Sequence, residues 1–121
     1  MYPWPVEMHP GKKLWLEKDG HVVMSDYRVR LLDLVQETGS LARAASTMKL
    51  SYRRAWGKVK ELEANVGFAL VESEVGGAGG GHTTLTPEAA ELVAAYHRFQ
   101  ERVGRFIEDV FAEEFAGAAG P

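Results

Sequence analysis

Two capped amphipathic segments joined by two residues constrain the fold of this chain more than any other feature of its sequence. Ser40 precedes LARAASTM and Ser51 precedes YRRAWGKVKELEANV, and a serine before an apolar-periodic run is a typical helix N-cap. The second run repeats apolar residues at helical spacing, at Ala55, Val59, Leu62 and Val66. Helices joined by residues 49–50 alone must cross steeply, which predicts a helix-turn-helix.

The residues before this pair predict a β-hairpin and one more helix. Asp19-Gly20 lies between two short apolar runs and suits a type I′ turn, because both residues tolerate positive φ. A two-residue turn there pairs Leu16 with Val23 in a hairpin over residues 12–24. Ser25 can then cap a first helix over residues 26–37, with an apolar stripe at Tyr27, Leu31, Leu34 and Val35.

The residues after the pair predict a wing and a long helix. FALVESE and TTLT are typical of two strands around a glycine-rich tip, over residues 68–86. Thr86-Pro87-Glu88 is a compact helix start, and we expect a helix over 87–115. Its apolar residues follow the seam of a coiled coil, at Leu92, Tyr96, Phe99, Val103, Phe106 and Val110. This seam predicts a homodimer; a long helix that closes the core of a monomer is the alternative.

These elements predict one domain over residues 1–121, mainly α with small β elements (α+β). Its order is an N-terminal hairpin (12–24), a first helix with the helix-turn-helix (26–67), a wing (68–86) and a long dimerisation helix (87–115). The start MYPWPVEMHP lacks the basic and apolar parts of a secretion signal. No apolar run approaches the roughly 20 residues that span a bilayer. We therefore expect a cytoplasmic protein without a membrane partner.

The charges are distributed unevenly along the chain. The formal net charge is −3, yet residues 41–60 carry six Lys or Arg and no Asp or Glu. Salt screens charges beyond about 8 Å at physiological ionic strength, so only the local block matters to a polyanion. The block predicts double-stranded DNA as the partner. A solvated helix face is the alternative.

The start of the second helix of the pair is the part that meets base edges in a helix-turn-helix. With the apolar stripe inward, Tyr52, Arg53 and Arg54 point outward. The planar guanidinium of arginine can bond both acceptors of guanine, and Ser51 with the helix-start amides suits a phosphate.

Other basic and polar residues are expected to contact the DNA backbone. Phosphate contacts are expected from Arg43, Lys58 and Lys60. Trp56 is expected at the edge of the buried stripe, with a DNA contact as the alternative. The wing offers hydrogen-bond donors to DNA at Gly79, Gly80, His82 and Thr83, and a mobile loop without a DNA contact is the alternative.

Patterns of catalysis and of metal or cofactor binding are weak. The four histidines form no HExxH spacing, and no serine lies in a GxSxG motif. The glycine-rich tip is not GxxxxGK[ST], and the chain has no cysteine. We expect no enzyme activity, no metal and no cofactor.

The sequence GSLARAASTMKLSYRRAWGKVKELE resembles the DNA-binding domain of LysR-type regulators and, more closely, of ModE-type molybdate-responsive regulators. SYRRAW matches the recognition-helix pattern of the ModE type, GGAGGG followed by LT matches its wing, and KLWLE fits its preceding strand. The resemblance covers about residues 12–112.

The resemblance implies a winged helix-turn-helix transcription regulator that dimerises through its long helix and binds a two-fold operator. Residues 51–56 would belong to the recognition helix and residues 76–83 to the wing. Full-length family members carry C-terminal molybdate-binding domains, whereas this sequence stops after the long helix at Pro121, so molybdate sensing is not assumed for it. A separate effector-sensing protein or constitutive action are both open. A protein-interaction module, whose partner carries sensing or catalysis, is the alternative function.

Overall fold

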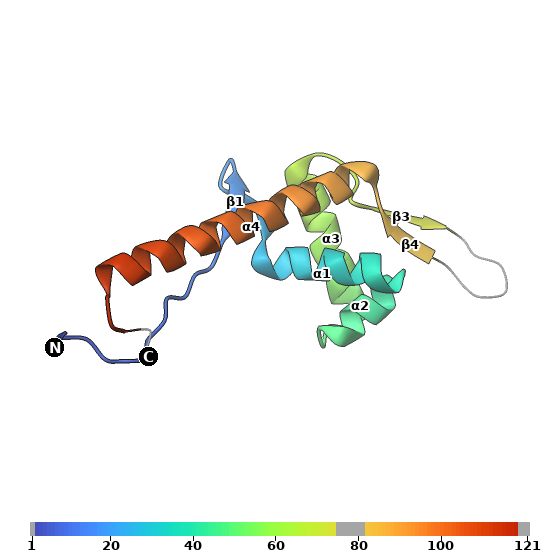
Figure 1. Cartoon of the computed structure of the whole chain (residues 1–121). Coiled ribbons are helices and arrows are strands. Elements are labelled where there is room, and N and C mark those ends of the chain that lie inside the picture. The colour runs from blue at the N-terminus through green and yellow to red at the C-terminus, as the bar shows by residue number, and fades with distance from the viewer. Residues whose placement is uncertain (1, 75–81, 119–121) are drawn as a thin grey trace. The chain divides into compact units, whose positions relative to one another are not determined.

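The computed structural model describes residues 2–74 and 82–118, which form two compact units. The larger unit spans Leu14–Tyr96, and the smaller one joins residues 2–13 to residues 97–118. The elements are β1 (Trp15–Lys18), β2 (His21–Ser25), α1 (Asp26–Thr38), α2 (Leu41–Thr47), α3 (Tyr52–Val66), β3 (Val71–Glu74), β4 (His82–Leu85) and α4 (Pro87–Glu114) (Figure 1). Helices with two small antiparallel sheets confirm the predicted α+β class among the described residues.

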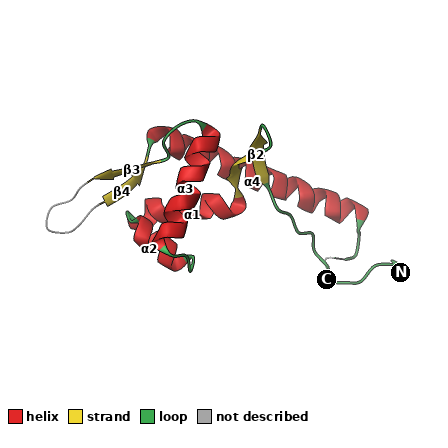
Figure 2. Ribbon diagram, turned by 180° about the vertical axis from the view of Figure 1, so that it is seen from behind, coloured by secondary structure: helices red, strands yellow, loops and turns green. Residues whose placement is uncertain are grey.

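The core of the larger unit consists of two clusters of buried side chains, and α1 contributes to both. One cluster joins α1 to the hairpin, to α3 and to the start of α4, through Met24, Val29, Leu32, Leu62, Leu70, Ala89, Val93 and Tyr96. The other joins α1 to α2 and α3, through Leu31, Val35, Leu41, Ala44, Ala45, Ala55 and Val59. Figure 2 shows α3 beside α1, with β3 and β4 at one end of this unit. The alanines of α2 let α3 approach closely, and α1 supports the helix pair from behind.

The predicted caps of the helices are confirmed. The side chains of Ser25, Ser40 and Ser51 each accept a hydrogen bond at 3.1 Å from the amide three residues further on. Gly39 and Gly67 end α1 and α3 in the left-handed conformation, with φ of 68° and 90°. Each serine cap stabilises its helix by about 1 kcal/mol. Because these caps involve only residues close in sequence, local interactions determine where the helices begin and end.

The apolar stripe predicted for α1 is wrong at its first member. Tyr27 is 44% exposed, whereas the buried residues of the helix are Val29, Leu31, Leu32 and Val35. Because α1 packs against two clusters, its buried face is wide and is centred away from Tyr27. Tyr27 is thereby left on the surface.

The register predicted for the hairpin is also wrong. Asp19 and Gly20 form the turn with φ of 53° and 78°, as a type I′ turn requires. The register then shifts beside Leu16, which pairs with Met24 instead of Val23. The extra residue on β2 is a β-bulge, and it lets the fully buried Met24 join the core.

The wing is tied to the junction of α1 and α2. Strands β3 and β4 pair from Val71 with Leu85 to Glu74 with His82. The amide of Thr83 donates to the carbonyl oxygen of Gly39 at 2.8 Å. The base of the wing is therefore positioned by the same glycine that ends α1.

The start of α4 is anchored in the larger unit through Tyr96. Its hydroxyl lies 2.7 Å from the Leu14 carbonyl oxygen and 2.7 Å from Oδ1 of Asp26, and donates its proton between them. The other carboxylate oxygen of Asp26 accepts from the Leu14 amide at 3.1 Å. Burial raises the pKa of Tyr96, and the hydrogen bond to Asp26 and its negative charge raise it further.

In the smaller unit, the N-terminal segment contacts the turn that follows α4. The indole of Trp4 donates to the carbonyl oxygen of Ala116 at 3.2 Å, and its ring meets the edge of Phe115 with centroids 5.3 Å apart. Tyr2 stacks on Trp4, also at 5.3 Å. Within the described residues, no helix has the length and apolar character needed to cross a membrane.

Candidate nucleic-acid interface

The turn that presents α3 is a Schellman motif. The Leu50 amide donates to the carbonyl oxygen of Ala45 at 2.9 Å, and the Lys49 amide donates to that of Ser46 at 3.0 Å. Lys49 adopts the left-handed conformation, with φ of 58°. These hydrogen bonds satisfy the last carbonyl groups of α2 and fix the direction in which α3 leaves the turn.

The first turn of α3 exposes three of the predicted recognition side chains. Tyr52 is 56% exposed, and Arg53 and Arg54 are exposed beside it. Among the described residues, neither arginine forms an ion pair, whereas Arg28 lies 3.7 Å from the carboxylate of Glu61. Both guanidinium groups are therefore free to meet a polyanion. The hydroxyl of Ser51 accepts from the helix, which leaves its own proton to donate.

One flank of α3 carries a cation that is already engaged. The ammonium of Lys60 lies 4.4 Å from the ring centroid of Trp56 and 3.0 Å from the Glu63 carboxylate. Trp56 is 38% exposed, between the core and the surface. Of the predicted phosphate contacts, Lys60 is therefore the one whose charge is partly neutralised within the chain.

Glu63 joins α3 to the wing. Its carboxylate accepts from the amides of Leu70 at 2.7 Å and Val71 at 3.4 Å. Partial burial raises the pKa of Glu63, but these hydrogen bonds and the nearby ammonium of Lys60 outweigh the burial and hold the pKa below its usual value. Glu63 is therefore ionised at neutral pH and holds β3 against α3.

The other flank of α3 faces α1. The ammonium of Lys58 lies 5.2 Å from the ring centroid of Tyr27, which places Lys58 on the edge of the interface away from Trp56. Arg43 is exposed on α2, and among the described residues neither Lys58 nor Arg43 forms an ion pair.

The predicted wing contacts fall partly outside the described residues. Gly79 and Gly80 are among residues 75–81, which the structure does not describe. His82 is exposed, and its ring lies against Gly39, where an added Cβ would come within 2.4 Å of it. Thr83 uses its amide to hold the wing to Gly39. The DNA contacts of all four wing residues stay predictions.

Three residues near the interface were missed by the sequence analysis. Tyr27 was expected in the core, Arg30 was given no role, and Lys49 was counted in the basic block of residues 41–60 without a contact of its own. Together with Thr47 and Met48, they line a surface hollow of about 300 Å³. Tyr27 and Arg30 are three residues apart and so share one face of α1, which is a signal that the sequence already contained.

Only some of the apolar residues in the seam predicted for the dimer are exposed. Tyr96 is 1% exposed and belongs to the core, so its side chain is not available to a partner. Leu92 packs partly buried against the same core cluster. Further along α4, Val103 is half-buried, and the exposed members are Phe99 (37%), Phe106 (68%) and Val110 (37%).

Among the described residues, no group of three or more His, Asp or Glu side chains is placed to hold a metal ion.

Residues 27–90, which include α1, the helix pair and the wing, match the bacterial regulatory helix-turn-helix proteins of the lysR family. The chain belongs to this family. Within the lysR-family match, Lys49 and the start of α3 lie in the helix-turn-helix that gives the family its description.

Several relatives are ModE proteins. The chain is 40% identical over 92 residues to the molybdenum transport protein ModE of Herbaspirillum seropedicae, covering 74% of this chain and 34% of that protein. It is 36% identical over 85 residues to the transcriptional regulator ModE of Haemophilus influenzae, covering 68% of this chain and 33% of that protein. The lysR-family chain therefore spans about one third of the length of these relatives.

Solved structures share the fold of this lysR-family chain. The CbnR_DBD–DNA complex matches with a TM-score of 0.57 and 24% identity, over 75% of this chain and 99% of that one. The BenM_DBD/benA site 1 DNA complex matches with a TM-score of 0.56 and 19% identity, over 78% and 99%. At this level of identity the likeness establishes the fold, which confirms the predicted winged helix-turn-helix.

Proposed function

We propose that this chain is a sequence-specific, DNA-binding transcription regulator that acts as a homodimer. The observation that carries the proposal is the pair of arginines at the exposed start of α3, which form no ion pair with any described residue, in a family of regulatory helix-turn-helix proteins. Arg53 and Arg54 read base edges in the major groove, and Lys58 and Arg43 bind backbone phosphates. Tyr52 contacts a sugar, a phosphate or a thymine methyl group.

The apolar side chains exposed on α4 support the dimer. Phe106 is 68% exposed, and Phe99 and Val110 lie on the same side of the helix at spacings of seven and four residues. A second copy of α4 would cover this stripe, and a dimer would bring two recognition helices to a two-fold operator.

The relatives' names connect those proteins to molybdenum, but the match covers only one third of their length. For this chain the proposal is limited to DNA binding and regulation. The signal comes either from a separate effector-sensing protein or from none, if the regulator is constitutive.

The test is binding of the purified chain to DNA from upstream of its own gene, measured by footprinting and fluorescence anisotropy at several salt concentrations. We expect a protected two-fold site with half-sites about 34–36 Å apart. Replacing Arg53 or Arg54 by Ala should remove about 1–3 kcal/mol of discrimination between the correct base and a wrong one.

Lys18→Ala is the matched control, because Lys18 is an exposed cation of the larger unit that lies on the hairpin. It should bind like the unaltered chain. Weak binding that is equal for all sequences, and equal in the two arginine variants, would reject a sequence-specific regulator and favour a protein-interaction module.

A further inference from the structure

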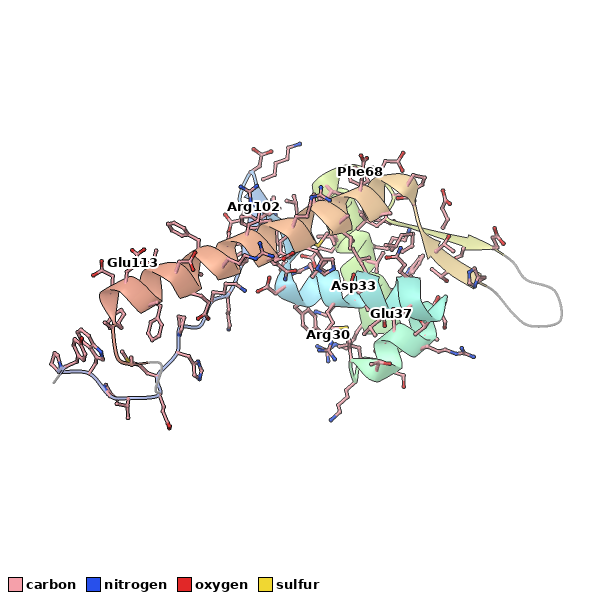
Figure 3. The ribbon with its side chains drawn as sticks, in the orientation of Figure 1. Arg30, Asp33, Glu37, Phe68, Arg102 and Glu113 are labelled. Atoms are coloured by element: carbon pink, nitrogen blue, oxygen red, sulfur yellow. The ribbon has the colours of Figure 1, made fainter. Side chains whose placement is uncertain are left out.

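The surface hollow between α1 and the turn before α3 has a composition that suits an anion. It is lined by Tyr27, Arg30, Thr47, Met48 and Lys49 and encloses about 300 Å³. Its lining includes two cations and two hydroxyl groups but no carboxylate. Figure 3 shows Arg30 on the side of α1 that faces this turn, whereas Asp33 and Glu37 lie further along the helix.

The cations of the hollow have no ion-pair partner in the part of the chain that the structure describes. Among the described residues, Arg30, Lys49 and Lys58 form no ion pair. Lys58 adds a third positive charge at the edge, because its ammonium lies 5.2 Å from the ring centroid of Tyr27. Like charges that line one hollow repel one another, and a bound anion offsets this repulsion.

The backbone of Lys49 is a second, independent observation. Lys49 occupies the left-handed position of the Schellman motif with φ of 58°, where glycine is the usual residue. A side chain in this conformation is strained, and such strain tends to persist where the side chain has a use. Lys49 lines the hollow together with Arg30, and it lies in the turn that leads to the start of the recognition helix.

We infer that this hollow binds a backbone phosphate of the operator, with Lys49 and Arg30 as its cationic ligands and Tyr27 as a hydroxyl donor. The inference rests on the proposed DNA binding and adds residues to it. Within the larger unit, the wing strands lie at the opposite side of α3 from this turn (Figures 1 and 2). With α3 in the major groove, the hollow therefore contacts the DNA backbone that borders the groove on the side away from the wing. The protein then contacts the DNA backbone on both sides of the groove.

The experiment measures binding of operator DNA at several salt concentrations for the full chain and for Lys49→Gly and Arg30→Ala. Each phosphate contact that is lost lowers the slope of log K against log salt by about 0.9. We expect each variant to lose about that much, with the same ranking of operator sequences as the unaltered chain. Lys49→Gly should at the same time raise the melting temperature, because glycine accepts the left-handed backbone without strain.

The opposite effects expected of Lys49→Gly on DNA binding and on the melting temperature distinguish a lost DNA contact from a damaged fold. A more stable variant that binds DNA less tightly is not explained by damage to the fold. Unchanged salt slopes for both variants, with specific binding by the unaltered chain, would overturn the inference and leave the proposed function intact. Absence of specific binding by the unaltered chain would instead overturn the proposed function itself.

Discussion

At the scale of single residues, the interface is organised by which charges are paired within the chain. The arginines that begin α3 have no acidic partner among the described residues, whereas Lys60 is held by Glu63 and by the ring of Trp56. Paired charges gain little from a phosphate, because they must first give up their partner. The pairing thus separates residues suited to bind DNA from residues that hold the wing.

Glu63→Gln should destabilise the fold by about 1–2 kcal/mol at neutral pH, because the amides of Leu70 and Val71 lose a charged acceptor. The pKa of the Glu63 carboxyl is lower in the folded chain than in the unfolded chain. Its contribution is therefore complete above the unfolded pKa and is lost as pH falls through the folded pKa. Urea unfolding at a series of pH values should show the two proteins converging as the pH falls below the usual pKa of a glutamate carboxyl and through the lower folded pKa of Glu63.

The control for this prediction is Glu61→Gln, two residues away on the same helix. Glu61 is 62% exposed and lies 3.7 Å from Arg28, so its replacement should change the stability by less than about 0.5 kcal/mol. Equal losses from the two variants would show that Glu63 does not hold β3.

At the scale of elements, one glycine links the helix pair to the wing. Gly39 ends α1 with φ of 68°, accepts the hydrogen bond from Thr83 and lies under the ring of His82. A side chain at this position would be strained and would also have to displace that ring.

Gly39→Ala should therefore destabilise the fold by more than the roughly 1–2 kcal/mol that the left-handed backbone alone costs alanine. Gly67→Ala is the matched control, because Gly67 has φ of 90° and nothing within 4 Å of an added Cβ. Thermal unfolding should rank Gly39→Ala below Gly67→Ala, and His82→Ala should remove most of the difference. If both glycine variants lose the same stability, the His82 contact does not constrain the wing.

At the scale of the whole molecule, the proposed homodimer depends on which apolar residues of α4 are exposed. In the smaller unit, Trp4 contacts Phe115, which lies just after α4. Among the heptad residues of α4, Tyr96 is buried in the core, whereas Phe106 and Val110 are exposed. The stripe available to a second copy is therefore narrower than the heptad pattern alone indicated.

Phe106→Glu should convert a dimer into a monomer, because a charge would be buried in the apolar seam. Analytical ultracentrifugation would measure the change. Ala112→Glu is the control, since it adds the same charge at an exposed position on another side of α4. If Phe106→Glu leaves the mass unchanged, this stripe is not the dimer interface.

The sequence by itself determined the helices and the helix-turn-helix, because their ends depend on contacts within a few residues. Ser25, Ser40 and Ser51 cap amides three residues away, and Gly39 and Gly67 end the helices by their own backbone freedom. Turn chemistry likewise placed the hairpin at Asp19-Gly20.

Only the tertiary structure decided the hairpin register, the exposure of Tyr27, the burial of Tyr96 and the grouping of Arg30 with Lys49. Each of these depends on contacts between residues far apart in the chain. The bulge that buries Met24 and the hydrogen bond from the Tyr96 hydroxyl to Asp26 both depend on how the elements pack. The spacing of apolar residues along the sequence does not predict either of them.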